Sequence, residues 1–439
     1  MSEATSPRPR HQYEAFLHQL PVEWEQKEIT QVGAIVGGGT PSREVPSFWR
    51  GPIPWVTPGE VSGEKAQLLH DTNDHISASG LAGSGASLLP AGSLLVTTRA
   101  TLGARVINAV PMATNQGFKS IVFKKPEEAG YYYHLFEKVK PELVRRASGT
   151  TFLEISGAEF GSIKVPSPSQ DERLKIAQLL DTLDTAIHQT EAIVEKLKQV
   201  KQGLLHDLSM RGVNANGELR ATHEQAPHLY KESPLGWIPK EWETKTIAQL
   251  GTVVGGGTPS REVPSFWRGE IPWLTPGEVS KETAKYLSDT SDHISPSGLV
   301  GSGANLLPKG SLMVTTRATL GARVINAVPM ATNQGFKSII FRRPEDASYY
   351  YHVFERVEPE LVRRASGTTF LEISGTEFSG IQVPSPPPSE KDSIAQMLDT
   401  ADRHIANETG QFVKLTAQKL GLMDDILTGR VRVTPLLAK

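Results

Sequence analysis

The stretch Val96–Ile121, VTTRATLGARVINAVPMATNQGFKSI, occurs twice in this chain, because it returns letter for letter as Val314–Ile339. A second stretch, Pro141–Gly157 (PELVRRASGTTFLEISG), returns unchanged as Pro359–Gly375. From Glu23 onward most residues recur at the same offset. A repeat this long exceeds the period of solenoid proteins, so each copy is predicted to be a complete domain with its own core. Two near-identical domains would make the chain a built-in dimer.

Bulk composition sets the class of protein. The chain has 439 residues, of which 38% are hydrophobic, which suffices for two or three domains with real cores. It has no cysteine, which excludes disulfides and cysteine-ligated zinc and favours a reducing compartment. Neither an apolar leader at the N-terminus nor a membrane-length apolar run is found. The sequence therefore predicts a soluble, cytoplasmic protein.

Charge is unevenly distributed along the chain. The net charge of −2 gives no overall footprint of a nucleic-acid binder. However, cations outnumber acids between Arg99 and Lys164, whereas Asp171–Asp207 is slightly acidic. A basic domain joined to an acidic helix can have a positively charged binding face although the net charge of the chain is close to zero.

Each copy follows the same internal plan. Glycine- and proline-rich turns separate short β-type runs at Ser93–Thr98, Ala104–Asn108 and Ser120–Phe123. A helical segment, Tyr131–Arg146, precedes a last strand near Ile163–Val165. This order predicts an α+β fold with two repeated mixed α/β domains.

A heptad pattern follows each domain. In the first copy, mainly apolar residues follow one another at spacings that alternate between four and three. They are Ile176, Leu180, Leu183, Ile187, Thr190, Val194, Leu197, Lys201, Leu204 and Leu208. The second copy repeats this frame from Ile394 to Ile426. Such spacing is typical of a coiled-coil seam, and the polar Thr190, Lys201, Glu408 and Lys419 are positioned to fix its register. We expect the two long helices to form an antiparallel coiled coil with a pseudo-twofold axis.

These patterns divide the chain into seven segments. They are an N-terminal segment 1–21, a first repeated domain 22–168, a first long helix 169–211, a polar linker 212–236, a second repeated domain 237–387, a second long helix 388–428, and a C-terminal tail 429–439.

The sequence carries no recognisable catalytic motif. The loop Gly37–Thr40 lacks the lysine of a phosphate-binding loop and the strand–GxGxxG–helix context of a dinucleotide site. His70, Asp71, Asp74 and His75 resemble a ligand cluster, but Ser288 replaces His70 in the second copy, so no metal site is predicted. Neither a nucleophile elbow nor the tetrapeptide of an amino methyltransferase occurs. The chain is therefore predicted to have no catalytic residue and no cofactor of its own.

Residues suited to DNA binding cluster at strand ends and after the domain helix. Arginine pairs with guanine, asparagine and glutamine pair with adenine, and threonine and lysine reach phosphates. The candidates are Thr98, Arg99, Thr101, Arg105, Asn115, Gln116, Lys119, Arg145, Arg146 and Thr150 in the first copy, and Thr316, Arg317, Thr319, Arg323, Asn333, Gln334, Lys337, Arg363, Arg364 and Thr368 in the second.

A structural interpretation remains open for part of this set. Arg145 and Arg146 would also complement the C-terminus of a helix, and Asn115 and Gln116 would also satisfy the backbone of a turn. Trp24, Trp49 and Trp55, with their copies, are predicted to be packing residues rather than stacking platforms for bases.

Two globular repeats, each followed by a heptad helix, resemble the specificity subunit of Type I restriction–modification systems. Leu235–Trp242 (LGWIPKEW) is similar to the family's entry to a target-recognition domain, and Leu427–Val431 (LTGRV) to its C-terminal ending. The internal motifs Ile53-Pro54-Trp55 and Gly149-Thr150-Thr151, with their copies, are similar as well.

The resemblance implies a non-catalytic subunit that binds double-stranded DNA through two target-recognition domains in the major groove. It also implies that the paired helices hold these domains apart and dock two methyltransferase subunits, which methylate adenine N6 with S-adenosylmethionine. A restriction subunit using ATP and magnesium would be an additional partner. Family members commonly carry two dissimilar domains, whereas these copies repeat the candidate residues unchanged. Identical binding domains related by a twofold axis predict a palindromic, interrupted target.

Three other interpretations are compatible with parts of this pattern. The chain could serve a methyltransferase–nuclease fusion instead of separate subunits. It could be a duplicated enzyme with one active site per copy, against which the His70–Ser288 difference argues. It could also be a coiled-coil scaffold, which predicts no salt-sensitive DNA binding and leaves the cationic and amide residues at the strand ends unexplained.

Overall fold

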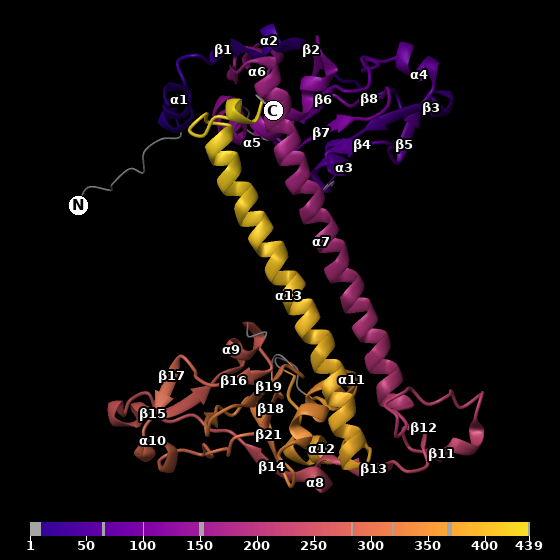
Figure 1. The fold of residues 1–439 in the computed structure, drawn as a ribbon, viewed down its shortest axis with the longest axis vertical. Helices are drawn as coiled ribbons and strands as arrows, with labels where there is room; N and C mark the ends of the chain where they lie inside the picture. The colour runs from indigo at the N-terminus through magenta and orange to yellow at the C-terminus, as the bar shows by residue number, and fades with distance from the viewer. Residues whose placement is uncertain are drawn as a thin grey trace. The chain divides into compact units, whose positions relative to one another are not determined.

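The computed structural model describes residues 10–63, 66–99, 101–148, 153–281, 284–317, 320–366 and 371–437. The chain forms two compact units (Figure 1). Unit 1 comprises residues 1–191 and 410–439, and unit 2 comprises residues 192–409. Each unit therefore contains one copy of the repeat and one segment of each long helix.

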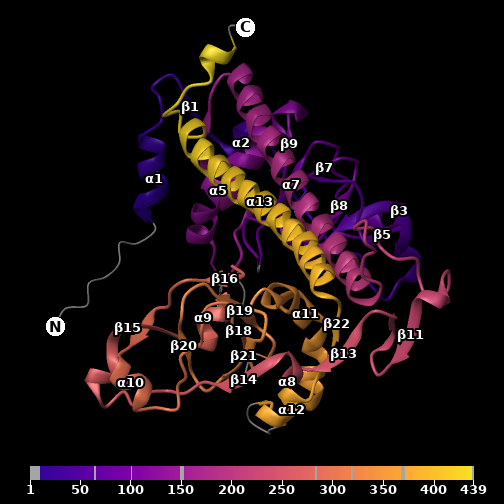
Figure 2. The ribbon, with the colours of Figure 1, turned by 60° about the horizontal axis from the view of Figure 1, so that its bottom comes forward.

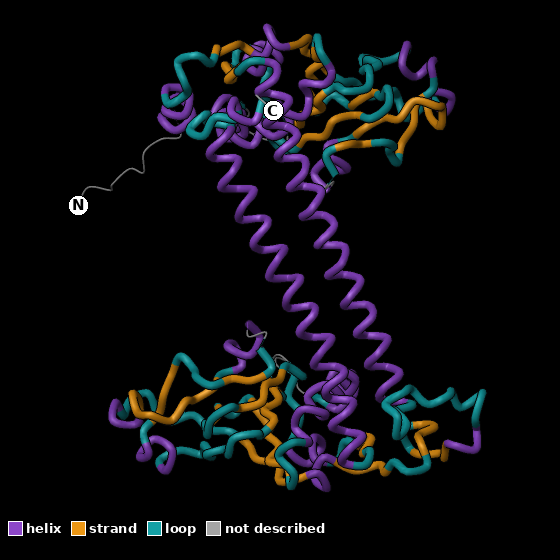
Figure 3. The backbone as a smooth tube through the Cα atoms, viewed as in Figure 1, coloured by secondary structure: helices purple, strands orange, loops and turns teal. Residues whose placement is uncertain are grey.

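A five-stranded sheet forms the centre of unit 1. Its order is β2 (Gly33–Gly37), β9 (Phe118–Phe123), β6 (Leu94–Thr97), β7 (Arg105–Asn108) and β4 (Leu68–Leu69). Neighbouring strands are antiparallel except β4 and β7, which are parallel. A three-stranded sheet of β5 (Asp74–Ile76), β3 (Trp49–Val56) and β8 (Ala113–Thr114) and a pair of β1 (Glu25–Glu28) with β10 (Lys164–Ser167) complete it. Figure 3 shows these strands as short pieces separated by long loops.

The sheet is buried on both faces because its strands are apolar at consecutive positions. Leu94 and Val96 of β6 pack into the main core of unit 1, whereas Leu95 packs into a separate cluster on the other face. Successive side chains of a strand point to opposite faces, so a fully apolar strand needs cover on both. Helix α5 (Ala129–Arg146) supplies the cover for the first face through residues such as Leu135 and Val139.

Short helices complete unit 1. They are α1 (Arg10–His18), α2 (Ile29–Val32), α3 (Pro58–Gly63), α4 (Ala78–Ala82) and α6 (Gly157–Gly161), with 3-10 turns at Pro46–Phe48 and Pro126–Glu128.

Unit 2 repeats this architecture. Its five-stranded sheet has the order β14 (Gly251–Gly255), β21 (Phe336–Phe341), β18 (Leu312–Thr315), β19 (Arg323–Asn326) and β16 (Tyr286–Leu287). The other strands are β15 (Trp267–Leu274), β17 (Asp292–Ile294), β20 (Ala331–Thr332), β13 (Glu243–Thr246) and β22 (Gln382–Ser385). Its helices are α8 (Ile247–Leu250), α9 (Pro276–Lys281), α10 (Pro296–Val300), α11 (Asp346–Arg364) and α12 (Gly375–Ser379). The α+β class with two repeated mixed domains is thus confirmed.

The long helices are α7 (Gln170–Met210) and α13 (Pro388–Ile426). Within each unit their segments lie side by side and run antiparallel (Figures 1 and 2). In unit 1 Asp184 of α7 pairs with Lys419 of α13, and in unit 2 Lys201 of α7 pairs with Asp402 of α13 at 2.7 Å. Lys201 and Lys419 are two of the polar residues that the heptad pattern places in the seam, and these ion pairs give their charge a partner. Within the described residues, no helix is long and apolar enough to cross a membrane.

The segment before each domain differs between the units. In unit 1 it forms helix α1, whereas in unit 2 it forms a hairpin of β11 (Tyr230–Ser233) and β12 (Gly236–Pro239). The polar stretch before the hairpin is ordered, because Arg220 and the backbone N–H of Val213 both bind Glu390, the latter at 2.9 Å. Polar contacts of this kind have no apolar periodicity in the sequence, so the stretch is predicted there only as a linker.

Candidate DNA interface

Three strands bring polar residues from distant parts of the sequence to one end of the five-stranded sheet. In unit 1 the register pairs Gly37, the last residue of β2, with Lys119 of β9, and Thr97, the last residue of β6, with Phe118. The loops that follow β2 and β6 therefore meet the loop that precedes β9 at the same edge. We call Thr40, Arg99, Asn115, Gln116, Lys119 and Glu154 the sheet-end cluster of unit 1.

Two cations of this cluster share one carboxylate. The Nε atom of Arg99 lies 3.8 Å from Glu154, and the Nζ atom of Lys119 lies 3.7 Å from the same side chain. Both distances exceed hydrogen-bond length, so neither cation is held tightly. The side chain of Arg99 is 44% exposed. A phosphate or a base edge can therefore replace Glu154 as its partner at little cost.

The amide residues of the cluster have different roles. Asn115 accepts a hydrogen bond from the backbone N–H of Gly117 at 2.8 Å, which stabilises the turn before β9. Gln116 is exposed and accepts a hydrogen bond from the hydroxyl of Thr40. Its amide NH₂ group is the donor end of a side chain that pairs well with adenine. The turn interpretation thus describes Asn115 better than Gln116.

Unit 2 builds the same cluster from the counterpart residues. Arg317 lies 3.7 Å from Glu372, and its side chain is 45% exposed. Asn333 accepts from the N–H of Gly335 at 2.8 Å, and Gln334 accepts from Thr258. Lys337 is paired with Gly255 in the register, as Lys119 is with Gly37. The sheet-end cluster of unit 2 is Thr258, Arg317, Asn333, Gln334, Lys337 and Glu372.

Other candidate residues have their polar groups engaged inside the domain. Thr98 is buried and its hydroxyl donates to the carbonyl of Gly117 at 3.3 Å, and Thr316 does the same with Gly335. The guanidinium of Arg105 binds Glu137 and the carbonyl of Tyr133. Arg323 binds Glu355 and Tyr351 in the same way, and burial lowers its pKa. These four residues are well placed to support the sheet end.

The paired arginines lie at the C-terminal end of the domain helix, where their guanidinium groups are engaged by a glutamate of the same helix. Arg145 and Arg146 both bind the buried Glu142 of α5, at 2.7 Å through their Nε atoms. Burial alone would raise the pKa of Glu142, but these hydrogen bonds lower it. Arg363 and Arg364 bind Glu360 of α11 with similar geometry. Within the described residues, these four arginines thus bind carboxylates of their own helices and make no hydrogen bond or ion pair with a residue of a sheet-end cluster.

Four candidate threonines complete the predicted set. Thr101 is exposed beside Arg99. Thr150, Thr319 and Thr368 lie outside the described residues, as does the whole Gly-Thr-Thr motif in both copies.

Two members of each cluster were missed by the sequence analysis. Thr40 and Glu154, like Thr258 and Glu372, lie far in sequence from the residues that they contact. Their recurrence in both copies was the available signal, but it is shared with most of the chain and so does not single them out. Only the folded sheet shows that they contact Gln116 and Arg99.

Three of the loop residues considered as metal ligands are engaged in ion-pair contacts. Asp74 binds Arg43 at 2.5 Å, and Asp71 lies 2.8 Å from His75. Arg43 also stacks on Trp49, 3.5 Å from the ring centre, and the indole N–H of Trp55 donates to the carbonyl of Gly39. The two tryptophans therefore hold the glycine loop that carries Thr40, as the packing interpretation predicts.

Comparison with known proteins gives one family for both copies. Residues 21–199 and 239–417 each match the family described as Type I restriction modification DNA specificity domain. The Type I restriction enzyme MjaIX specificity subunit of Methanocaldococcus jannaschii is 27% identical over 432 residues, which cover 96% of this chain and 97% of that protein. The EcoR124I/EcoR124II specificity subunit of Escherichia coli is 29% identical over 253 residues, which cover 56% of this chain and 57% of that protein.

Solved structures show the same fold. The S subunit of a Type I restriction–modification system from M. genitalium has a TM-score of 0.58 at 13% identity, over 93% of this chain and 98% of that one. A chain from a study of complex assembly in the type I R-M system has a TM-score of 0.52 at 14% identity, over 94% of this chain and 99% of that one. The two family matches cover most of the chain, and they confirm the resemblance found in its motifs. The chain belongs to the Type I restriction–modification specificity subunits, the non-catalytic subunits that determine the DNA target.

Proposed function

We propose that the two sheet-end clusters contact the two halves of an interrupted, palindromic DNA target. The observation that carries this proposal is the repetition of the cluster: Arg99 and Gln116 recur as Arg317 and Gln334 with the same partners. Lys119 recurs as Lys337 at the same register position of the sheet. Equal side chains on equal scaffolds read equal bases, so the half-sites should be inverted copies of one sequence. Their centres are expected about one helical turn, roughly 10 bp, apart.

The division of labour within the cluster follows from its chemistry. The exposed Arg99 and Gln116 carry the donors that discriminate bases, guanine and adenine respectively. Lys119 is more buried, with 16% of its side chain exposed, and supplies a positive charge behind them. Glu154 balances these charges in the free protein and gives way to phosphate on binding.

The chain acts in this proposal as one subunit of a larger complex. Two N6-adenine methyltransferase subunits dock on the paired helices α7 and α13, and each half-site contains the adenine that is methylated. S-adenosylmethionine belongs to those subunits, and ATP with magnesium belongs to a restriction subunit where one joins. Service to a methyltransferase–nuclease fusion is the alternative, and the genes beside this one distinguish the two cases.

A methylome of the host, with this gene intact and then deleted, tests the target. We expect N6-methyladenine to disappear from a single interrupted palindrome. Loss from a motif with two unrelated half-sites would contradict the symmetry, and an unchanged methylome would contradict the proposed role.

Variants of the purified complex with its methyltransferase test the contact residues. R99A and R317A should each weaken DNA binding by about 1–3 kcal/mol, and by equal amounts, because they contact equivalent bases. The matched controls are K124A and R342A, which remove exposed cations at the opposite end of the same sheets. Normal binding and methylation by the R99A/R317A double variant would remove these arginines from the interface.

A further inference from the structure

The outer face of the domain helix is covered in unit 1 by the chain's own helix α1. Tyr13 of α1 is 5% exposed, and its hydroxyl donates to the backbone carbonyl of Lys164 at 2.8 Å. The ring of Phe16 lies 5.5 Å from that of Tyr13, and Leu17 and Leu20 pack against the same core. Helix α1 thus fills a groove between α5 and β10.

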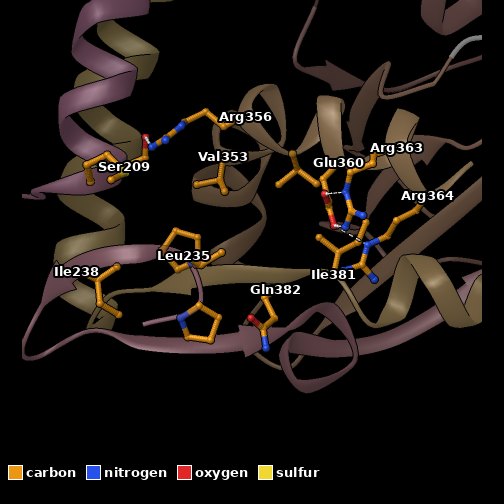
Figure 4. Close-up of a pocket in the computed structure, with 14 residues that line it drawn as sticks. Ser209, Leu235, Ile238, Val353, Arg356, Glu360, Arg363, Arg364, Ile381 and Gln382 are labelled. Carbon is orange, nitrogen blue, oxygen red and sulfur yellow. Dashed lines mark hydrogen bonds and ion pairs between the residues drawn. The ribbon is translucent and has the colours of Figure 1, made fainter. Parts of the chain in front are cut away.

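The counterpart groove of unit 2 is a pocket of about 460 Å³ (Figure 4). Its apolar wall includes Leu235, Ile238 and Val353, and its polar rim includes Glu360, Arg363 and Gln382. By the repeat, Leu235 and Ile238 correspond to Leu17 and Leu20, and Gln382 corresponds to Lys164. The two copies differ in structure just before these residues. In unit 1 helix α1 packs on the domain helix, whereas in unit 2 the same part of the copy forms the hairpin strand β11. The pocket therefore lies where Tyr13 stands in unit 1.

The exposed fractions of side chains on the two domain helices show the effect of covering the helix with α1 in unit 1 only. Glu142 is 4% exposed beneath α1, whereas its counterpart Glu360 is 31% exposed. Arg145 is 26% exposed, whereas Arg363 is 68% exposed. The helix sequence in this stretch is the same, PELVRR, so the difference comes from what lies on it.

The pocket also carries positive charge that unit 1 balances and unit 2 does not. Lys138 of α5 binds Asp424 at 2.7 Å, but the counterpart of Asp424 in unit 2 is His206. The corresponding Arg356 instead donates to the hydroxyl of Ser209 at 2.8 Å, and among the described residues no carboxylate pairs with it. In unit 1 the charge of Glu14 on α1 is one of the groups that raise the pKa of Arg145, after the hydrogen bond to Glu142. An occupant of the pocket should therefore bring a carboxylate.

We propose that this pocket binds an amphipathic helix of a partner protein that presents a tyrosine and an adjacent acidic residue. The tyrosine ring packs between Leu235 and Val353 and its hydroxyl donates to the carbonyl of Gln382, as Tyr13 does to Lys164. The acidic residue pairs with Arg363 or Arg356. A second copy of this chain is a poorer occupant, because its own α1 is already buried on its unit 1. The two similar units thus differ in partner binding, with one groove filled from within and one filled by another protein.

A peptide with the sequence of Arg10–Leu20 (RHQYEAFLHQL) is the probe, since it fills the equivalent groove. Binding of the fluorescently labelled peptide to the full-length chain is measured by anisotropy. We expect saturable binding, at least tenfold weaker for the peptides Y13A and E14K and more mildly weakened for Y13F, which keeps the ring and loses the hydrogen bond. Because these changes are made in the peptide, they do not affect folding of the chain.

A charge reversal locates the binding in unit 2. R363E should weaken binding at least tenfold, whereas R342E, a reversal at the end of β21 outside the pocket, should not change it. No saturable binding at millimolar peptide, or equal binding by R363E and the unchanged chain, would overturn the proposal. Dimers in light scattering that R363E dissociates would show that a second copy of the chain is the occupant, which would overturn the partner helix.

Discussion

Units 1 and 2 carry nearly the same domain, yet they differ in the cover of the domain helix, in the partners of a buried glutamate and in the residue beside a buried histidine. Unit 1 covers its domain helix with α1, whereas unit 2 leaves a pocket there. Unit 2 binds Glu390 from three sides, whereas the equivalent Glu172 binds chiefly Arg432. Gln67 of unit 1 is replaced by Lys285 in unit 2, beside a buried histidine. The repeated sequence determines the domain, and the segments where the copies differ determine what surrounds it.

The largest difference should come from the two buried carboxylates. Glu390 is 8% exposed and binds Arg220, the N–H of Val213 and the indole N–H of Trp242, the last at 3.0 Å. Removing it would leave two buried donors without a partner, and would leave the half-buried Arg220 with only the carbonyl of Arg211 and the more distant Glu241. We expect E390A to destabilise unit 2 by about 3–5 kcal/mol, measured by hydrogen exchange of the peptides of each unit.

The matched variant is E172A in unit 1. It removes the acceptor of Arg432, which is 29% exposed and also lies 3.2 Å from Glu23. The indole N–H of Trp24 has no hydrogen-bond partner among the described residues. E172A therefore does not remove a hydrogen bond from this tryptophan, unlike E390A for Trp242. E172A should therefore cost less than E390A, and an equal or larger cost would mean that the network around Glu390 adds nothing beyond one ion pair.

The second difference concerns pH. His352 is buried, and its Nε2 atom lies 2.6 Å from Asp399, which Lys285 also binds at 2.5 Å. Burial is the main cause that lowers the pKa of His352, and the positive charges of Lys285 and Lys201 add to it. Burial alone would raise the pKa of Asp399, but the hydrogen bonds from His352 and Lys285 hold it at about 2.

The sign of the effect follows from the lowered pKa. The neutral imidazole is favoured in the fold, so its contribution to stability is complete above the unfolded pKa of 6.5 and is lost as pH falls through the folded value. K285Q, which places the residue of unit 1 in unit 2, should raise the pKa of His352 and reduce this acid loss. NMR titration of the imidazole measures it, with K309Q as a control at an exposed site. A pKa of His352 unchanged by K285Q would show that Lys285 has no influence on it.

The smallest difference concerns the arginines at the helix ends. Arg145 binds the buried Glu142 under α1, whereas Arg363 binds the counterpart Glu360, and both of these side chains are more exposed to solvent. R145A should lower the thermal unfolding midpoint, because it leaves a buried carboxylate with one fewer donor. R363A should leave the midpoint unchanged, since water replaces the exposed pair. Equal shifts in both variants would show that α1 does not shield the pair in unit 1.

Most of the fold could be predicted from the repeat and from the heptad pattern. They predicted the two mixed domains, the helix that ends at Arg146 and the long helices, because periodicity and turn residues are local properties of the sequence. The strand near Ile163–Val165 was placed within two residues of β10. Helix α1 and the hairpin of β11 and β12 were not predicted, since a short polar segment is ordered by what it packs against.

The sequence by itself determined that this chain carries two equal domains on two heptad helices, and that the same candidate cations and amides occur in both. Tertiary structure alone decided which of them meet: strand register brings Arg99, Gln116 and Lys119 to one sheet end, whereas Arg145 and Arg146 are engaged by the buried Glu142. It also decided that one copy of a groove is filled and the other open. The physical reason is that identity and periodicity are encoded locally, whereas contact and burial depend on chain segments far apart in sequence.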